Sequence, residues 1–105
     1  MDEVVLAERF FKIANQRAAA AGRSFGPGAG SDLRQLAQTG AANVLAVSDP
    51  SARDALEKEA EAGIQRLVDL MIEEARKIPG YPADLLGEDS FYPAKLRFCP
   101  FRPFC

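Results

Sequence analysis

Histidine and tryptophan are absent from this chain of 105 residues, and cysteine occurs only twice. Without histidine the chain lacks the commonest general base and a frequent zinc ligand, so catalysis by a serine–histidine or cysteine–histidine pair within one chain is excluded. The same absence excludes a carboxylate di-metal site built on paired Glu-x-x-His motifs. No stretch approaches the roughly 20 apolar residues that a membrane span needs. We therefore expect a non-catalytic protein with no cofactor, no bound metal and no membrane span.

Hydrophobic residues make up 48% of the chain. Much of that fraction is alanine, so the sequence predicts a thin core of Leu, Ile, Val and a few Phe side chains. A chain of this length suits one domain of marginal stability, because a small domain buries a modest share of its surface. The N-terminal sequence Met-Asp-Glu-Val-Val lacks the basic start of a secretory signal, and we expect a cytoplasmic protein.

Three segments show apolar residues at helical spacing, which predicts an all-α fold, a small three-helix bundle formed by residues 1–78. Asp2, Ser31 and Asp49 stand where N-caps are expected, and Pro50 suits the first position of the third helix. The expected helices cover residues 3–21, 32–47 and 50–77. A flexible glycine-rich loop is expected at 22–30. It leads into a helix N-terminus, so anion binding is the alternative to a plain connection there.

Two further features of the helices bear on function. Gly40 and Ala41 are small residues on the apolar face of the second helix, so another helix can approach closely there, and self-association is one possibility. Paired carboxylates one turn apart, such as Glu57 with Glu61, offer acid–base chemistry in principle. Like-charged pairs at this spacing usually mark a solvated face, which is the interpretation we adopt.

Residues 79–105 differ in character from the helices, since they hold five of the seven prolines. We expect a long extended C-terminal tail here, except for one helical turn over 83–86. The segment also carries large apolar side chains, which are unusual in a solvated linker. We therefore expect it to pack on the helices or on a partner.

The last eight residues repeat with a period of three, which matches the three residues per turn of a polyproline II strand. Phe98, Phe101 and Phe104 would then form one edge of the strand, and the prolines another. The third edge would carry Arg102 between two cysteines. The pattern predicts a preformed recognition strand. Its partner-binding residues are Phe98, Phe101, Arg102 and Phe104.

Charge is distributed unevenly behind the small net value of −2. Residues 49–89 carry eleven acidic and five basic side chains, whereas residues 90–105 carry three basic side chains and no acidic one. A basic tail on an acidic body can fold back onto that body or bind an acidic partner. Three positive charges are too few to argue for nucleic acid, so we expect a protein partner or self-association instead.

Cys99 and Cys105 leave four states open: a disulfide, a shared soft metal, separate free thiols, or a chemical modification. A polyproline II strand would separate residues six apart by roughly 19 Å. A disulfide needs Cα atoms about 4.4–6.8 Å apart. The bridged state and the extended strand therefore exclude each other, and oxidation would act as a switch between them.

Three functional hypotheses follow. The first is a non-catalytic interaction protein, such as an accessory subunit, adaptor or inhibitor, that uses the C-terminal tail as its anchor. The second rests on a resemblance of layout: a helical segment before a short Cys-, Pro- and aromatic-rich end is similar to precursors of ribosomally made, modified peptides. The third is a thiol-based redox or metal-handling protein that uses Cys99 and Cys105.

Overall fold

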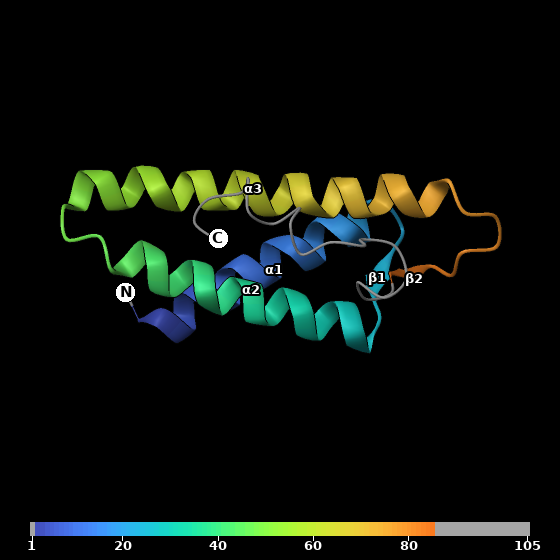
Figure 1. Cartoon of the computed structure of the whole chain (residues 1–105), viewed down its shortest axis with the longest axis horizontal. Helices are drawn as coiled ribbons and strands as arrows, with labels where there is room; N and C mark the ends of the chain where they lie inside the picture. The colour runs from blue at the N-terminus through green and yellow to red at the C-terminus, as the bar shows by residue number, and fades with distance from the viewer. Residues whose placement is uncertain (1, 86–105) are drawn as a thin grey trace.

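Three helices and one short pair of strands make up the part of the chain that the structure, a computed structural model, describes, residues 2–85. The expected all-α three-helix bundle is confirmed (Figure 1). The elements are α1 Glu3–Ala20, β1 Ser24–Phe25, α2 Pro27–Leu45, α3 Pro50–Arg76 and β2 Asp84–Leu85.

The helices run up, down and up, so α1 and α3 are parallel (Figure 1). The ion pairs follow this direction, because Arg9 of α1 meets Glu57 of α3 and Arg17 meets Asp69, farther along both helices. Helix α1 packs closely against both of the others, whereas α2 and α3 approach each other least. Helix α1 is therefore the element that holds the bundle together.

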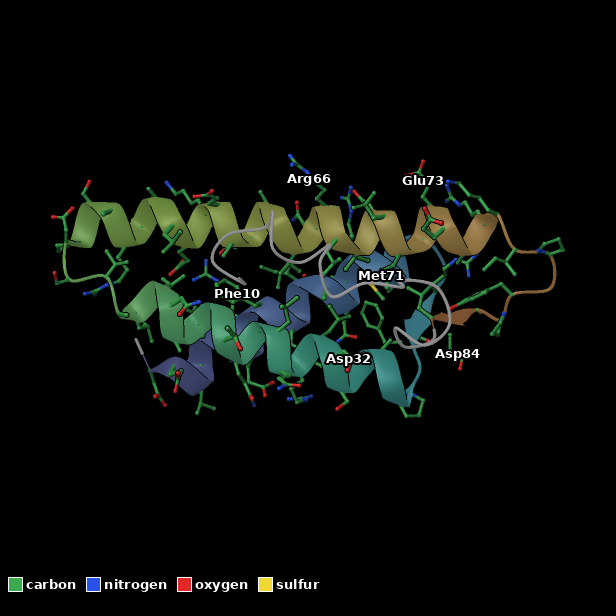
Figure 2. All side chains as sticks on the ribbon, in the orientation of Figure 1. Phe10, Asp32, Arg66, Met71, Glu73 and Asp84 are labelled. Atoms are coloured by element: carbon green, nitrogen blue, oxygen red, sulfur yellow. The ribbon has the colours of Figure 1, made fainter. Side chains whose placement is uncertain are left out.

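The core lies where α1 meets the other two helices. Phe10 is fully buried and Met71 is 2% exposed, whereas Arg66 and Glu73 point away from the bundle (Figure 2). The core is richer in alanine than we expected. Small side chains allow the helix backbones to approach closely, so alanine here contributes to packing rather than only to helix propensity. The alanines without any exposed surface are Ala14, Ala18, Ala29, Ala37, Ala41 and Ala60.

The helix starts agree with the sequence in two cases, α1 and α3, and differ in one, α2. Asp49 caps α3 as expected, and its carboxylate accepts a hydrogen bond of 2.9 Å from the amide of Ala52. Asp2 occupies the N-cap position of α1, but its side chain makes no capping hydrogen bond. Helix α2 starts at Pro27 with Gly26 as N-cap, so the expected start at Asp32 behind a Ser31 cap is wrong.

The early start of α2 has a physical reason. Proline fits the first turn of a helix, where its missing amide hydrogen is not needed. Each glycine that follows costs about 1 kcal/mol of helix propensity. Burial of Ala29, which has no exposed surface, offsets part of that cost. Tertiary packing therefore overrides the local preference for a flexible loop.

The β1–β2 pair replaces two other sequence expectations. Ser24 and Phe25 were expected in a loop, and Asp84 and Leu85 in a helical turn, but these residues pair as parallel strands. Both strands follow helices that run in the same direction and leave the same end of the bundle (Figure 1). A parallel arrangement follows from this topology.

Candidate functional site

The residues singled out as functional from the sequence fall in the C-terminal segment, outside the described residues. What the structure describes is the place from which that segment departs. The predicted positions concerned are Phe98, Cys99, Phe101, Arg102, Phe104 and Cys105.

The C-terminal segment starts from a clasp formed by β1 and β2. The amide of Gly26 donates a hydrogen bond of 2.7 Å to the carbonyl of Leu85, and the amide of Ser24 donates one of 3.3 Å to Ala83. Arg23 adds a guanidinium hydrogen bond of 3.2 Å to the carbonyl of Pro82. The Leu85 side chain has no exposed surface and belongs to the core. The last described residue is thus fixed on the helical body.

Sequence reasoning missed this clasp because two-residue strands are too short to show alternation of apolar and polar side chains. Glycine offered one usable signal. Gly22 has a φ of 73°, a left-handed conformation that ends α1 and turns the chain toward β1. No pattern in the sequence around Arg23 indicates its contact, since the accepting carbonyl of Pro82 lies 59 residues away.

The paired carboxylates of α3 are engaged by arginine. Arg9 Nη1 lies 3.1 Å from Glu57 Oε2, and Arg9 Nη2 lies 3.0 Å from Glu61 Oε2. The second contact is close enough for an ion pair, although its angle does not meet hydrogen-bond geometry. Both carboxylates therefore lie at the seam between α1 and α3 and share one guanidinium. Their side chains are 18% and 26% exposed, so the expected solvated face is wrong for this pair, which joins the two helices.

Arg17 and Asp69 form a further ion pair between α1 and α3. Two parallel hydrogen bonds of 2.8 Å join the guanidinium to the carboxylate. These hydrogen bonds lower the pKa of Asp69 from its ordinary value of 3.8, and they raise the pKa of Arg17. A bidentate pair also fixes the relative register of the two helices.

We expect Asp69→Asn to reduce stability at neutral pH but not in strong acid. A carboxylate with a lowered pKa contributes stability above its unfolded value, and the contribution is lost as pH falls through the folded value. The difference in unfolding midpoint between the wild type and Asp69→Asn should therefore shrink below about pH 4. Urea unfolding at pH 7 and pH 3 measures it.

Asp54→Asn is the matched control, because Asp54 pairs only within α3, with Lys58 one turn later. We expect a smaller change for this variant, since exposed pairs within a helix contribute little. An equal midpoint for wild type and Asp69→Asn at pH 7 would contradict the role of the Arg17 contact.

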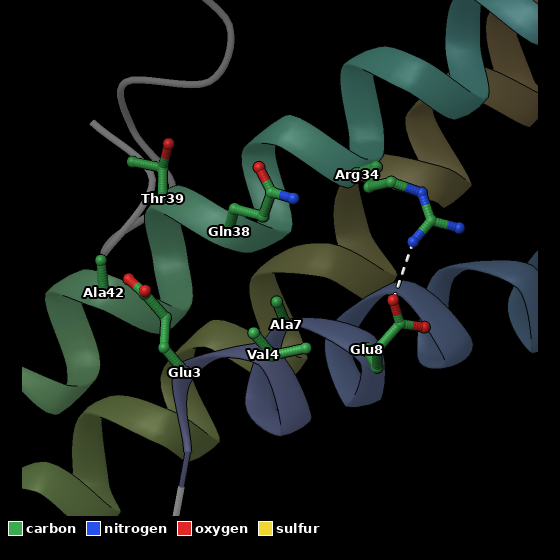
Figure 3. Close-up of a pocket in the computed structure, with 8 residues that line it drawn as sticks. All are labelled: Glu3, Val4, Ala7, Glu8, Arg34, Gln38, Thr39 and Ala42. Atoms are coloured by element: carbon green, nitrogen blue, oxygen red, sulfur yellow. Dashed lines mark hydrogen bonds and ion pairs between the residues drawn. The ribbon is translucent and has the colours of Figure 1, made fainter.

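A hollow of about 400 Å³ lies between α1 and α2, near the N-terminus of α1 (Figure 3). Glu8 and Arg34 bridge it with an ion pair of 2.8 Å. The Arg34 guanidinium also lies 4.3 Å from the centre of the Phe11 ring. Val4 in its wall is 64% exposed, so the hollow offers a small apolar surface beside a neutralised ion pair.

Ion pairs from Glu8, Arg9 and Arg17 thus join α1 to the other two helices. In this part of the chain no group of three or more His, Cys, Asp or Glu side chains is placed to hold a metal ion. None of the helices described there combines the length and apolar character that crossing a bilayer requires. Comparison of the chain with protein-family models, with curated proteins and with solved structures finds no match in any of the three.

Proposed function

We propose that the protein is a non-catalytic binding component, an accessory subunit, adaptor or inhibitor, that engages a protein partner through its C-terminal segment. The contacts would come from Phe98, Phe101, Arg102 and Phe104. The clasp is the observation that carries this proposal. Because Leu85 is buried and hydrogen-bonded to Gly26, the segment leaves from a defined point on a rigid body.

A fixed origin matters for affinity. A segment held at one end by a folded body loses less freedom on binding than a free peptide does, and its prolines reduce that loss further. Phenylalanine and arginine are both enriched in protein interfaces relative to the rest of the surface. The engaged carboxylates Glu57, Glu61 and Asp69 support a scaffolding role for the helices rather than a catalytic one.

The chemistry of the segment indicates the kind of surface it fits. Proline-rich strands dock into grooves lined with aromatic side chains. Lys95, Arg97 and Arg102 add positive charge with no acidic residue nearby in the sequence. The expected partner therefore presents an apolar groove with acidic residues at its rim.

Affinity capture from the source cells tests the proposal. We expect a partner to be retained by the full-length protein and lost with Phe101→Ser/Phe104→Ser. Truncating two buried aromatic anchors typically weakens an interface by about 2 kcal/mol or more, roughly thirtyfold. A protein ending at Gly87 should behave like the double variant. Quantitative mass spectrometry of the captured proteins gives the ratio.

Cys99→Ser/Cys105→Ser is the control, because it keeps the aromatic and proline edges while removing both thiols. We expect this variant to retain the partner. If it loses the partner while Phe101→Ser/Phe104→Ser keeps it, the thiols rather than the phenylalanines make the contact and the proposal fails. Equal capture by the full-length protein and the protein ending at Gly87 would also contradict it.

A further inference from the structure

The seam between α2 and α3 differs from the other two helix–helix seams. Every interhelical ion pair described for residues 2–85 has one partner on α1: Arg9, Arg17 or Glu8. Helices α2 and α3 also approach each other least. Two seams therefore combine close backbone approach with ion pairs, whereas the ion pairs described for residues 2–85 include none between α2 and α3.

Helix α3 presents an apolar row on the side away from its α1 contacts. Gly63 follows Glu61 by two residues, and Leu67 precedes Asp69 by two. A step of two residues turns a side chain by about 200° around the helix axis. Glu61 and Asp69 both pair with α1, so Gly63 and Leu67 lie on the opposite edge. Leu70 continues the row, and Leu67 is only 3% exposed.

Helix α2 carries the matching row. Leu36 follows Arg34 by two residues, and Arg34 pairs with Glu8 of α1. Gly40 follows Gln38 by the same interval, and Gln38 lines the hollow beside α1. Leu36 and Gly40 therefore lie on the edge away from that hollow. The two rows together define the α2–α3 seam: Leu36 and Gly40 on α2, with Gly63, Leu67 and Leu70 on α3.

The described chain ends at one mouth of this seam. Strand β1 contacts α2 and strand β2 contacts α3, and Leu85 is buried beside Gly26, the residue that caps α2. Twenty residues follow Leu85 in the sequence. Helix α2 is about 28 Å long at 1.5 Å per residue. Ten extended residues span about 33 Å, so half of the segment is enough to run the length of the seam.

The composition of residues 86–105 suits the seam. Large apolar side chains can cover the two rows, and the basic side chains can meet acidic ones at the rims. Asp32 lies four residues before Leu36, and Glu74, which also pairs with Lys77 at 3.5 Å, lies four residues after Leu70, so each borders its row. The large apolar residues of the segment are Leu86, Phe91, Tyr92, Leu96, Phe98, Phe101 and Phe104.

We propose that the α2–α3 seam is the docking surface for residues 86–105 of the same chain. Docking within one chain is favoured because Leu85 holds the segment at the mouth of the seam, which gives it a high effective concentration there. The proposal concerns the isolated protein and does not depend on the binding function proposed above. A partner that takes the C-terminal phenylalanines would compete with the seam for them.

Amide hydrogen exchange on the full-length isolated protein tests the docking. In Phe91→Ser/Tyr92→Ser we expect the amides of Gly40, Gly63 and Leu70 to exchange at least tenfold faster than in the wild type. Gln38 and Ala42 lie on α2, as Gly40 does, but they line the hollow beside α1. The exchange rates of their amides should change much less. Asp89→Ser is the matched control, because it alters the segment without touching an apolar residue, and it should leave all these rates unchanged.

Three results would overturn the proposal. Unchanged exchange along the seam in the double variant would show that the segment does not cover it. Equal acceleration on both sides of α2, repeated in the milder Tyr92→Ser, would show general destabilisation rather than loss of a cover. Restoration of protection on adding unlabelled wild-type protein to the isotope-labelled double variant would identify a second copy as the occupant.

Discussion

Phe10→Ala is expected to destabilise the protein by about 3–5 kcal/mol, the cost of removing a fully buried phenylalanine. Phe10 has no exposed surface and lies on α1, the helix that packs against both others. Removing it takes away the largest buried side chain of the core. Small domains have total stabilities of about 5–15 kcal/mol, and a domain at the low end of that range, as expected for this length, would lose most of its stability. Urea unfolding followed by circular dichroism measures the loss.

Val5→Ala is the appropriate comparison for Phe10→Ala. Val5 lies on the same helix but is 56% exposed, so its truncation should change stability by less than about 0.5 kcal/mol. A loss below about 1 kcal/mol for Phe10→Ala would mean that the junction of the three helices is not where the core is concentrated.

Leu85→Ala is expected to cost about 2–4 kcal/mol and to open the clasp. The side chain is fully buried although it lies beyond the helices, so its loss leaves a cavity at the end of the bundle. The amide of Gly26, which donates to the carbonyl of Leu85, should exchange with solvent much faster in the variant. Thermal unfolding and hydrogen exchange on the same sample separate the global effect from the local one.

Asp84→Ala provides the control for this experiment. Asp84 is the neighbouring strand residue and its side chain is exposed, so backbone pairing with Ser24 should persist. Faster exchange of Gly26 in Asp84→Ala as well would assign the effect to the strand backbone rather than to the buried leucine.

The helices were predictable because their signals are local and repeated. The apolar spacing of α1 and the Asp49–Pro50 start of α3 each identify an element without knowledge of the rest of the chain. The start of α2 was placed too late because glycine and proline predict a loop. The helix starts earlier because Ala29 is buried, and this burial depends on contacts with other elements that the local sequence does not show.

The clasp and the ion pairs were not predictable for a related reason. Arg17 meets Asp69 across 52 positions of sequence, and Arg23 meets Pro82 across 59. Nothing in the neighbourhood of either arginine marks its acceptor. The partner-binding prediction at Phe98, Phe101, Arg102 and Phe104 lies outside residues 2–85 and stays a prediction.

The β1–β2 pairing also has a consequence for the order of folding. Its register joins Ser24 to Asp84, so a loop containing all of α2 and α3 must close before either strand gains a partner. Closing so long a loop for two residues of pairing is unfavourable until the helices have already assembled. We therefore expect the strands to form last and to separate first under mild denaturant, which would free Leu85 while α1 remains packed.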